Sequence, residues 1–399
     1  MTKDKNYLQA INMFMQVVIA FFDIFFSIYI FDMSNNINFI FYYLIFQCAS
    51  VLLFEFIILK ILNDKNYLII YRLSFVFILI SIAFIFTISD KTLFMVFVVQ
   101  FVYALAIICY YLPHEVSVMN KNSKNTISTF VGIQQVLTLI AGIISPFISG
   151  FLIDYISYPV LFVFIIILSI ICFILSFKIN KGVVEEPKIK LKDFIKQAHK
   201  IKYTKYSYFS HAIHKASQCS VVMYLLPVLL FMKFNTNFSV GIFSAVATAL
   251  SGAVLILVTK FYKPKKIYII IATVIAVLTP IIIIYFSSIP LFFVYYFSTT
   301  ISIKLIAKYD AEMIYMSISD TPVEPYKKEH HWLFNLYDQV SKILSYVVAL
   351  VIYNFIKTEL TLSIIIFVLT FLQIFSSYLM IKSDNEYEKL IQINKEIIK

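Results

Sequence analysis

A few ionisable side chains lie inside long apolar runs, and these are the residues that could do chemistry in this chain. Charge in such a run is unfavourable unless it is paired or faces a cavity, so its position carries information. Asp23 lies within the first run, between two pairs of phenylalanines, with no basic residue one helical turn away. Burial there favours the neutral carboxyl, which a proton-coupling site requires. We therefore predict that Asp23 binds a proton or contacts a substrate, although an ion pair with Lys215 or Lys304 would also explain it.

A second candidate group is the set of basic residues near the start of the run 206–232. His211 and Lys215 are four residues apart and His214 is three residues from His211, so a helix would bring all three to one side. Two histidines at this spacing can bind a metal ion, but no third ligand lies nearby in the sequence, and no metal site is predicted. A proton relay or a pH-sensitive gate fits the pair better. Histidines that only anchor the helix at the membrane interface are the alternative.

The run 290–317 carries the densest charge. Lys304, Lys308 and Glu312 follow one another at steps of four and share a helix face, while Asp310 points elsewhere. Lys304 lies deepest in the run and could contact a substrate, including an anionic one. The other three approach the predicted cytoplasmic end and could form a gate instead.

Further charged residues could form gates or charge networks at the ends of their runs. Asp338 and Lys342 are four residues apart and could simply neutralise each other. The full set of gate or charge-network candidates is Glu55, Asp64, Lys65, Glu115, Lys308, Asp310, Glu312, Asp338 and Lys342.

The composition predicts that these residues are held by membrane-spanning helices. The chain is 61% hydrophobic and 14% charged, with a mean hydropathy of +0.88, which is not typical of a soluble domain. The net charge of +11 does not indicate nucleic-acid binding, because the lysines lie in short loops between apolar runs. The four cysteines all lie inside apolar runs and suggest neither a disulfide framework nor a metal site. The first apolar run is too long for a cleaved signal peptide.

A spanning helix needs about 20 mostly apolar residues. Twelve segments qualify, at 7–31, 37–59, 67–89, 92–119, 126–154, 158–178, 206–232, 237–259, 267–287, 290–317, 332–356 and 360–381. With both termini in the cytoplasm, only Lys91, Lys233 and Lys357 would face outward, so positive-inside bias predicts that orientation.

The two halves of the chain resemble each other. Phe31, Asn35, Lys60 and Lys65 have identical partners 200 positions later, at Phe231, Asn235, Lys260 and Lys265. We predict an all-α integral membrane protein with twelve transmembrane helices in two pseudo-symmetric six-helix bundles, 1–178 and 206–383. A basic cytoplasmic linker (179–205) joins them and a cytoplasmic tail (384–399) follows. In the linker, apolar residues at helical spacing predict a short amphipathic helix on the membrane surface, with a solvated linker as the alternative. These apolar residues are Leu191, Phe194, Ile195, Ala198 and Ile201.

Twelve helices in two related halves, with charge in the first, fourth, seventh and tenth, resemble the major facilitator superfamily. The acid–base pair Asp64-Lys65 is similar to that of the family's loop between helices 2 and 3, although the glycines of that loop are missing. In the fifth predicted helix, Ala141, Ser145-Pro146 and Ser149-Gly150 resemble the family's antiporter motif, which implies export; close helix packing alone would also explain these small residues. The arginine that proton-coupled drug exporters carry on helix 4 is absent. With only six glycines and a composition typical of AT-rich genomes, the chain is interpreted as a divergent bacterial member.

The resemblance implies a secondary active transporter that works by alternating access. We predict proton-coupled efflux of an amphipathic small molecule, drug or small peptide from a monomer in the cell membrane, with lipid, substrate and protons as its partners and no cofactor. Uptake of a nutrient or lipid-like solute is one alternative, and a sensor or immunity protein without turnover is another. No phosphate-binding loop or nucleophile–base pair is recognisable, so enzymatic activity is not predicted.

Overall fold

The computed structural model describes residues 2–63, 65–88, 94–121, 124–180, 191–219, 221–261, 265–285, 289–319, 327–355 and 358–398. Every regular element in these ranges is helical, and none of these residues forms a strand. The site candidate Asp64 lies outside the described residues.

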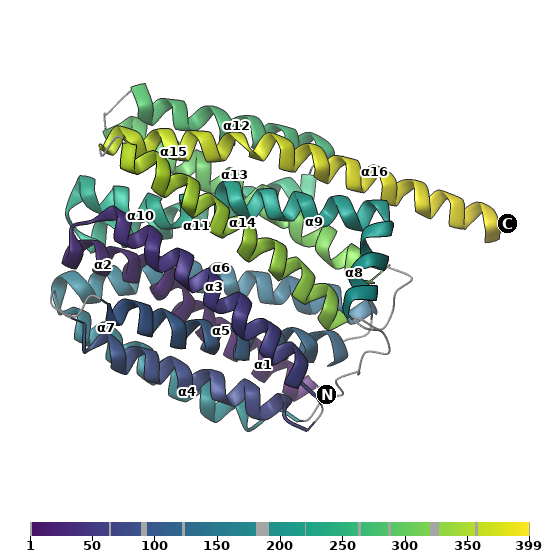
Figure 1. Cartoon of the computed structure of the whole chain (residues 1–399), viewed down its shortest axis with the longest axis horizontal. Helices are drawn as coiled ribbons and strands as arrows, with labels where there is room; N and C mark the ends of the chain where they lie inside the picture. Colours follow the sequence, from purple (N-terminus) through teal and green to yellow (C-terminus); the bar gives the residue numbers. More distant parts are fainter. Residues whose placement is uncertain are drawn as a thin grey trace. The chain divides into compact units, whose positions relative to one another are not determined.

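The first half of the chain, up to the linker, forms seven α-helices within the described ranges (Figure 1). They are α1 (Thr2–Ala20), α2 (Phe26–Ser34), α3 (Ile37–Ile61), α4 (Tyr67–Ile85), α5 (Met95–Lys121), α6 (Lys124–Tyr155) and α7 (Tyr158–Ser176). A turn of π-helix, Phe21–Phe25, joins α1 to α2, so one long helical segment occupies the position of the first predicted span.

The second half, with the linker, contains the remaining helices. They are α8 (Leu191–Lys200), α9 (Lys202–His214), α10 (Val221–Phe234), α11 (Asn237–Phe261), α12 (Lys265–Tyr285), α13 (Ile289–Ser319), α14 (Lys327–Phe355), α15 (Glu359–Phe371) and α16 (Gln373–Ile398). A second π-helical turn, Lys215–Cys219, follows α9.

The first connection in each half has the same backbone geometry. Asn35 and Asn235 both adopt left-handed φ angles, 46° and 54°, which asparagine tolerates better than most residues. Each backbone N–H donates at 2.7 Å to the carbonyl of the phenylalanine four residues earlier, Phe31 or Phe231. Identical residues thus end corresponding helices in the same way, which supports the internal repeat.

Within the described residues, ten helical segments are long and apolar enough to cross a membrane. Two shorter apolar helices, Tyr224–Phe234 and Lys266–Ile282, lie where the seventh and ninth spans are predicted. The chain is therefore a multi-pass, helical membrane protein, and the count of twelve spans stays a prediction. Several helices extend past their predicted ends; the last segment, for example, bends at Leu372 and continues as α16 to Ile398.

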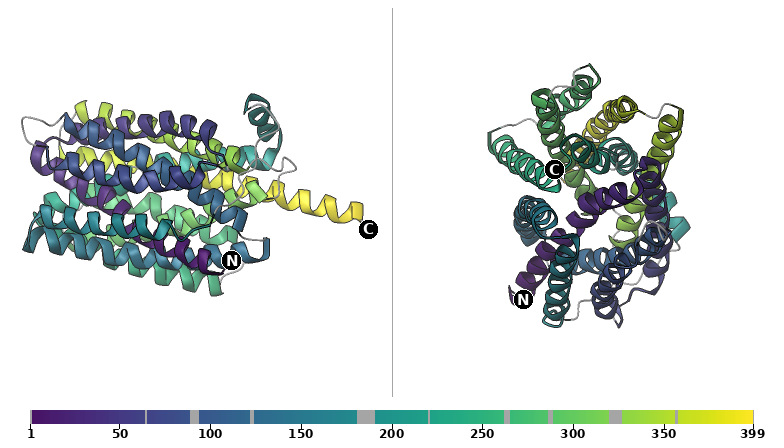
Figure 2. Two further views of the ribbon diagram at one scale, coloured as in Figure 1. Left: turned by 90° about the horizontal axis from the view of Figure 1, so that it is seen from below. Right: turned by 90° about the vertical axis from the view of Figure 1, so that its left-hand side faces the viewer.

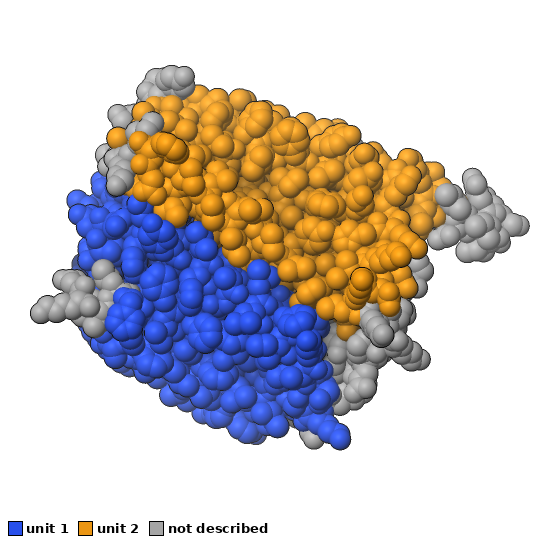
Figure 3. Space-filling model, viewed as in Figure 1, with its two compact units in different colours: residues 1–186, 223–249 blue, residues 187–222, 250–399 orange. Residues whose placement is uncertain are grey.

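The chain divides into two compact units (Figure 3). The first unit contains residues 1–186 and 223–249, and the second contains 187–222 and 250–399. Most of α10 and the first half of α11 therefore group with the first unit. In each unit the long helices lie side by side, as the views in Figure 2 show.

The linker helix α8 packs within the second unit. Phe194 and Ala198 are fully buried, and α8 lies against α9 and α14. His199 Nε2 lies 2.8 Å from the Tyr337 hydroxyl, and the ring of Phe194 meets His330 edge-on at 4.8 Å. The apolar side of α8 is thus largely occupied by protein instead of facing lipid.

Candidate functional site

Asp23 lies in the π-helical turn of the first unit. Such turns interrupt the regular bonding of a helix and are frequent at functional sites. Phe21, Phe22 and Phe25 in the same turn are buried, whereas Asp23 is partly accessible. Asp23 is thus the one ionisable residue in a turn whose other residues are apolar.

One neutral hydroxyl bonds to this carboxyl, and two more lie close by. The Tyr224 hydroxyl, on α10, donates to Asp23 Oδ1 at 2.9 Å. One turn away, Ser27 Oγ donates to the Asp23 carbonyl at 3.5 Å and also bonds to the Tyr43 hydroxyl. Phe22 stacks on Tyr103 with the ring centroids 3.8 Å apart. We call Asp23, Ser27, Tyr43 and Tyr224 the Asp23 site.

The small residues of the fifth predicted helix pack within the first unit. Ala141, Ser145 and Ser149 on α6 are buried, and Ser145 Oγ donates to the Val17 carbonyl of α1 at 3.1 Å. At Gly150, a β-carbon would lie 2.5 Å from the Asn237 carbonyl oxygen of α11. At Gly241 on α11, a β-carbon would collide with the carbonyl oxygen of Pro146. The motif therefore allows α6 and α11 to approach closely.

Asp154, at the end of α6, holds the start of α11. Its carboxylate accepts from Asn237 Nδ2 at 2.9 Å and from the Phe238 backbone N–H at 2.7 Å. The Tyr158 hydroxyl also donates to Asn237 Oδ1, at 3.3 Å. A carboxylate at this position satisfies backbone donors that a helix start leaves open.

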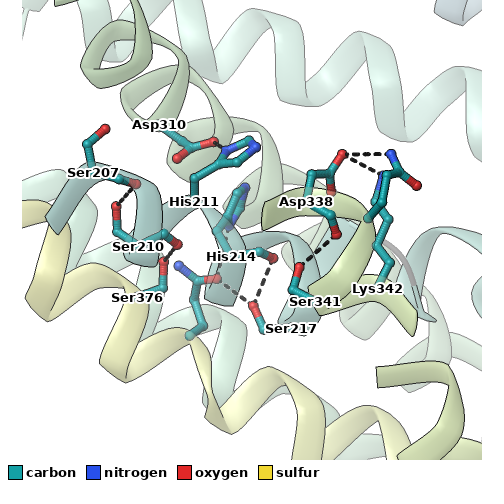
Figure 4. Close-up of polar contacts among 12 residues, drawn as sticks. Ser207, Ser210, His211, His214, Ser217, Asp310, Asp338, Ser341, Lys342 and Ser376 are labelled. Carbon is teal, nitrogen blue, oxygen red and sulfur yellow. Dashed lines mark hydrogen bonds and ion pairs between the residues drawn. The ribbon is translucent and has the colours of Figure 1, made fainter. Parts of the chain in front are cut away.

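The second unit contains a denser polar cluster, drawn in Figure 4. The ring of His211, on α9, points at Asp310 on α13, and Nδ1 lies 2.7 Å from Asp310 Oδ2. Both side chains are buried. Because a carboxylate can only accept, His211 Nδ1 is the donor in this hydrogen bond.

His214, on the next turn of α9, bonds to a different helix. Its Nδ1 lies 3.0 Å from Gln373 Oε1 on α16, which also accepts from Ser217 Oγ at 2.8 Å. Ser345 Oγ donates to the Ala216 carbonyl at 2.9 Å. Neighbouring helices therefore hold the π-helical turn Lys215–Cys219 by side-chain hydrogen bonds.

An ion pair lies beside these histidines. Lys342 Nζ is 2.9 Å from Asp338 Oδ2 on the same face of α14, as the sequence spacing predicts. Lys215 lies within electrostatic range of both Asp310 and Asp338. We call His211, His214, Lys215, Asp310, Asp338, Lys342 and Gln373 the His211 site.

Not every predicted candidate joins these two sites. Lys308 and Glu312 pair with each other at 3.7 Å along α13, and Lys304 lies one turn earlier. In the first unit, Glu55 is buried on α3, Lys65 is exposed, and Glu115 is partly exposed on α5 beside the buried His114.

The sequence interpretation missed a polar network in the first unit. Tyr110 donates to Asn12 Oδ1 at 3.0 Å and stacks on His114, which lies 3.4 Å from both the Tyr71 hydroxyl and Gln134 Nε2. It also missed Tyr224 and Gln373. Uncharged polar residues inside apolar runs were the available signal, but such residues are common and most bond to their own helix.

The described residues contain no group of three or more histidine, cysteine or acidic side chains arranged to hold a metal ion. What the two sites offer is proton binding and charge pairing inside apolar helices.

The fold is similar to that of a solved structure. A solved structure described as a bacterial metal transporter has the same fold, with a TM-score of 0.62 over 95% of this chain and 98% of that chain. The two sequences are only 10% identical. No protein-family model matches the chain, and no curated protein matches it either.

Proposed function

We propose that the protein is a secondary active transporter that works by alternating access and couples substrate movement to protons. The observation that carries this proposal is the buried His211–Asp310 pair, at 2.7 Å, in a transporter fold. An imidazole that is oriented by a carboxylate can take up and release a proton at Nε2 while the pair stays together. Asp23, which accepts a hydrogen bond from the Tyr224 hydroxyl, offers a second carboxyl inside the apolar helices.

Efflux of an amphipathic small molecule, drug or small peptide is the proposed direction and substrate class. The close α6–α11 contact at Gly150 and Gly241 supports it, because the small residues on α6 resemble an antiporter motif. The aromatic lining near Asp23, with Phe22 stacked on Tyr103, suits an apolar or aromatic group beside a charge. We place the protein in the cell membrane as a monomer with both termini inside.

A divalent metal ion is the second candidate substrate. His211 and His214 each have Nδ1 bound to a side-chain oxygen, which is the arrangement found in metal-ligating histidines. The similar solved structure is described as a metal transporter. The nearby cations Lys215 and Lys342 would repel a divalent ion, so we favour the organic substrate.

The test compares accumulation of drugs, dyes, small peptides and divalent metal ions in cells with and without the protein, before and after the proton gradient is collapsed. An exporter lowers accumulation until the gradient collapses. Uptake raises accumulation, and a sensor without turnover changes nothing; either result would overturn the proposed efflux.

The same assay tests the proposed coupling residue. Asp23→Asn keeps the acceptor for Tyr224 but cannot take up a proton, so gradient-driven transport should be lost while the protein still inserts. The matched control is Asp32→Asn. Asp32 is exposed on α2 in the same span, so this variant should retain transport. Full activity of Asp23→Asn would remove this carboxyl from the mechanism.

A further inference from the structure

A row of exposed lysines lies on α8 and the start of α9. Lys192, Lys196 and Lys200 follow one another at steps of four along α8, and all three are exposed. Lys202 and Lys205, at the start of α9, are exposed too. We call these five residues the lysine face.

The lysine face is turned away from the protein because the opposite side of α8 is already packed. Phe194 and Ala198 are fully buried, and His199 bonds to Tyr337 of α14 at 2.8 Å. An amphipathic helix normally holds to a bilayer by its apolar side. Here that side is largely used by the second unit, so any contact of α8 with the membrane depends on its charges.

Exposed apolar and aromatic residues adjoin the lysine face. On α9, Lys205 is exposed, and one turn later the exposed side chain is the apolar Phe209. On α16, Lys382 lies over the ring of Tyr206 at 4.6 Å, one turn after the exposed Tyr378. Tyrosines and lysines in this order mark the headgroup region of a bilayer.

Nearby carboxylates do not neutralise the lysine face. On α16, Lys266 holds Asp384 and Glu388 at 3.6 and 3.0 Å, and Lys389 holds Glu386 at 2.8 Å. Asp193 is exposed on α8 itself. Among the described residues, no ion pair joins a carboxylate to any of the five lysines, so the row keeps a net positive charge.

We propose that the lysine face binds the phosphate headgroups of anionic phospholipids. Five exposed lysines within 14 consecutive residues, next to exposed apolar side chains, match a surface of anionic lipid, and each lysine adds to the attraction. A soluble acidic protein would fit the lysine face less well, because the α9 end of this face adjoins exposed apolar residues. The bound headgroups would fix α8 and, through the His199–Tyr337 bond, the helices α9 and α14 that carry His211 and Asp338. The proposal does not depend on the transported substrate.

The test uses the purified full-length protein in nanodiscs made of phosphatidylcholine, with or without phosphatidylglycerol. The wild type should melt at a higher temperature with phosphatidylglycerol, and high salt should remove the difference. Native mass spectrometry of the same samples should show retained phosphatidylglycerol. Replacing Lys192, Lys196 and Lys200 together by Gln should abolish both effects, with affinity falling about fivefold for each lysine lost.

Two matched control variants distinguish the loss of lipid binding at this surface from a general loss of positive charge and from misfolding. The triple Lys→Arg variant at the same positions should keep both effects. A triple Lys→Gln variant at Lys60, Lys65 and Lys178, all exposed in the first unit, removes the same charge and should also keep them. Equal losses in the two Gln variants, or retained binding in the α8 variant, would overturn the proposal. Inorganic phosphate added to phosphatidylcholine nanodiscs should not raise the melting temperature; if it does, the face binds a free anion instead of lipid.

Discussion

The Asp23 site and the His211 site place carboxylates at membrane depth by different means. In the first unit, a neutral tyrosine hydroxyl holds the Asp23 carboxyl at 2.9 Å, and phenylalanines and tyrosines surround it. In the second unit, Asp310 bonds to a histidine at 2.7 Å and lies within range of Lys215. The first arrangement includes a hydrogen bond from an uncharged donor, whereas the second combines groups of opposite charge, so removing one of them leaves the other charge buried and unbalanced.

Replacing Asp310 by alanine should lower the stability of the protein more than the substitutions at Gly241, Tyr224 or Lys308 and Glu312. In Asp310→Ala, His211 loses its acceptor, and Lys215 and Lys342 outnumber the remaining carboxylate of the cluster. Breaking a buried pair in this way costs about 3–5 kcal/mol. We expect a large drop in thermal stability in detergent and loss of transport.

The double variant His211→Ala/Asp310→Ala is the control. It removes the pair as a whole, so it should recover part of the stability that the single variant loses. Equal losses in the single and double variants would indicate that cavities, and not charge imbalance, determine the effect.

Close packing against α6 also holds α11 in the first unit, and Gly241→Ala should disrupt this packing. The added methyl group would collide with the Pro146 carbonyl oxygen, and backbone atoms cannot move away as a flexible side chain can. We expect a loss of about 1–3 kcal/mol, typical of overpacking, measured by thermal melting. Gly142→Ala is the control, because its methyl group would lie 3.3 Å from the methyl group of Thr248 and should cost much less. Similar losses for both variants would contradict a specific α6–α11 contact.

A smaller effect is expected for Tyr224→Phe, which removes the hydroxyl that binds Asp23 but keeps the ring. The lost hydrogen bond should cost about 1 kcal/mol, since Asp23 is partly accessible and water can replace the donor. Combined with Asp310→Ala, the two losses should add within about 0.5 kcal/mol, as independent sites do. A strongly non-additive result would show that the two sites act as one.

The sequence predicted the helical membrane fold and several local pairs, but not the partners that complete each site. Apolar runs of spanning length are a strong signal, and i,i+4 spacing within one helix correctly paired Asp338 with Lys342. The partners of Asp23 and His211 come from distant helices, α10 and α13. Helix periodicity gives the direction of a side chain around its own helix and says nothing about which helix lies opposite. The π-helical turn at Asp23 could not be predicted either, because its residues are ordinary helix formers in an apolar context.

The smallest change in stability should come from Lys308 and Glu312, which are candidates for a gate or a binding site. Their atoms lie 3.7 Å apart along one helix, and their side chains are 20% and 31% exposed, so water and salt weaken the attraction. Replacing both by Gln should change stability by only about 0.3–0.5 kcal/mol and leave transport unchanged. The same double replacement at Asp338 and Lys342 should cost more, because that pair is closer, at 2.9 Å, and less exposed. If the Lys308–Glu312 variant instead lost transport at unchanged stability, this pair would act in the transport cycle, and the functional cluster of the second unit would extend along α13 beyond Asp310.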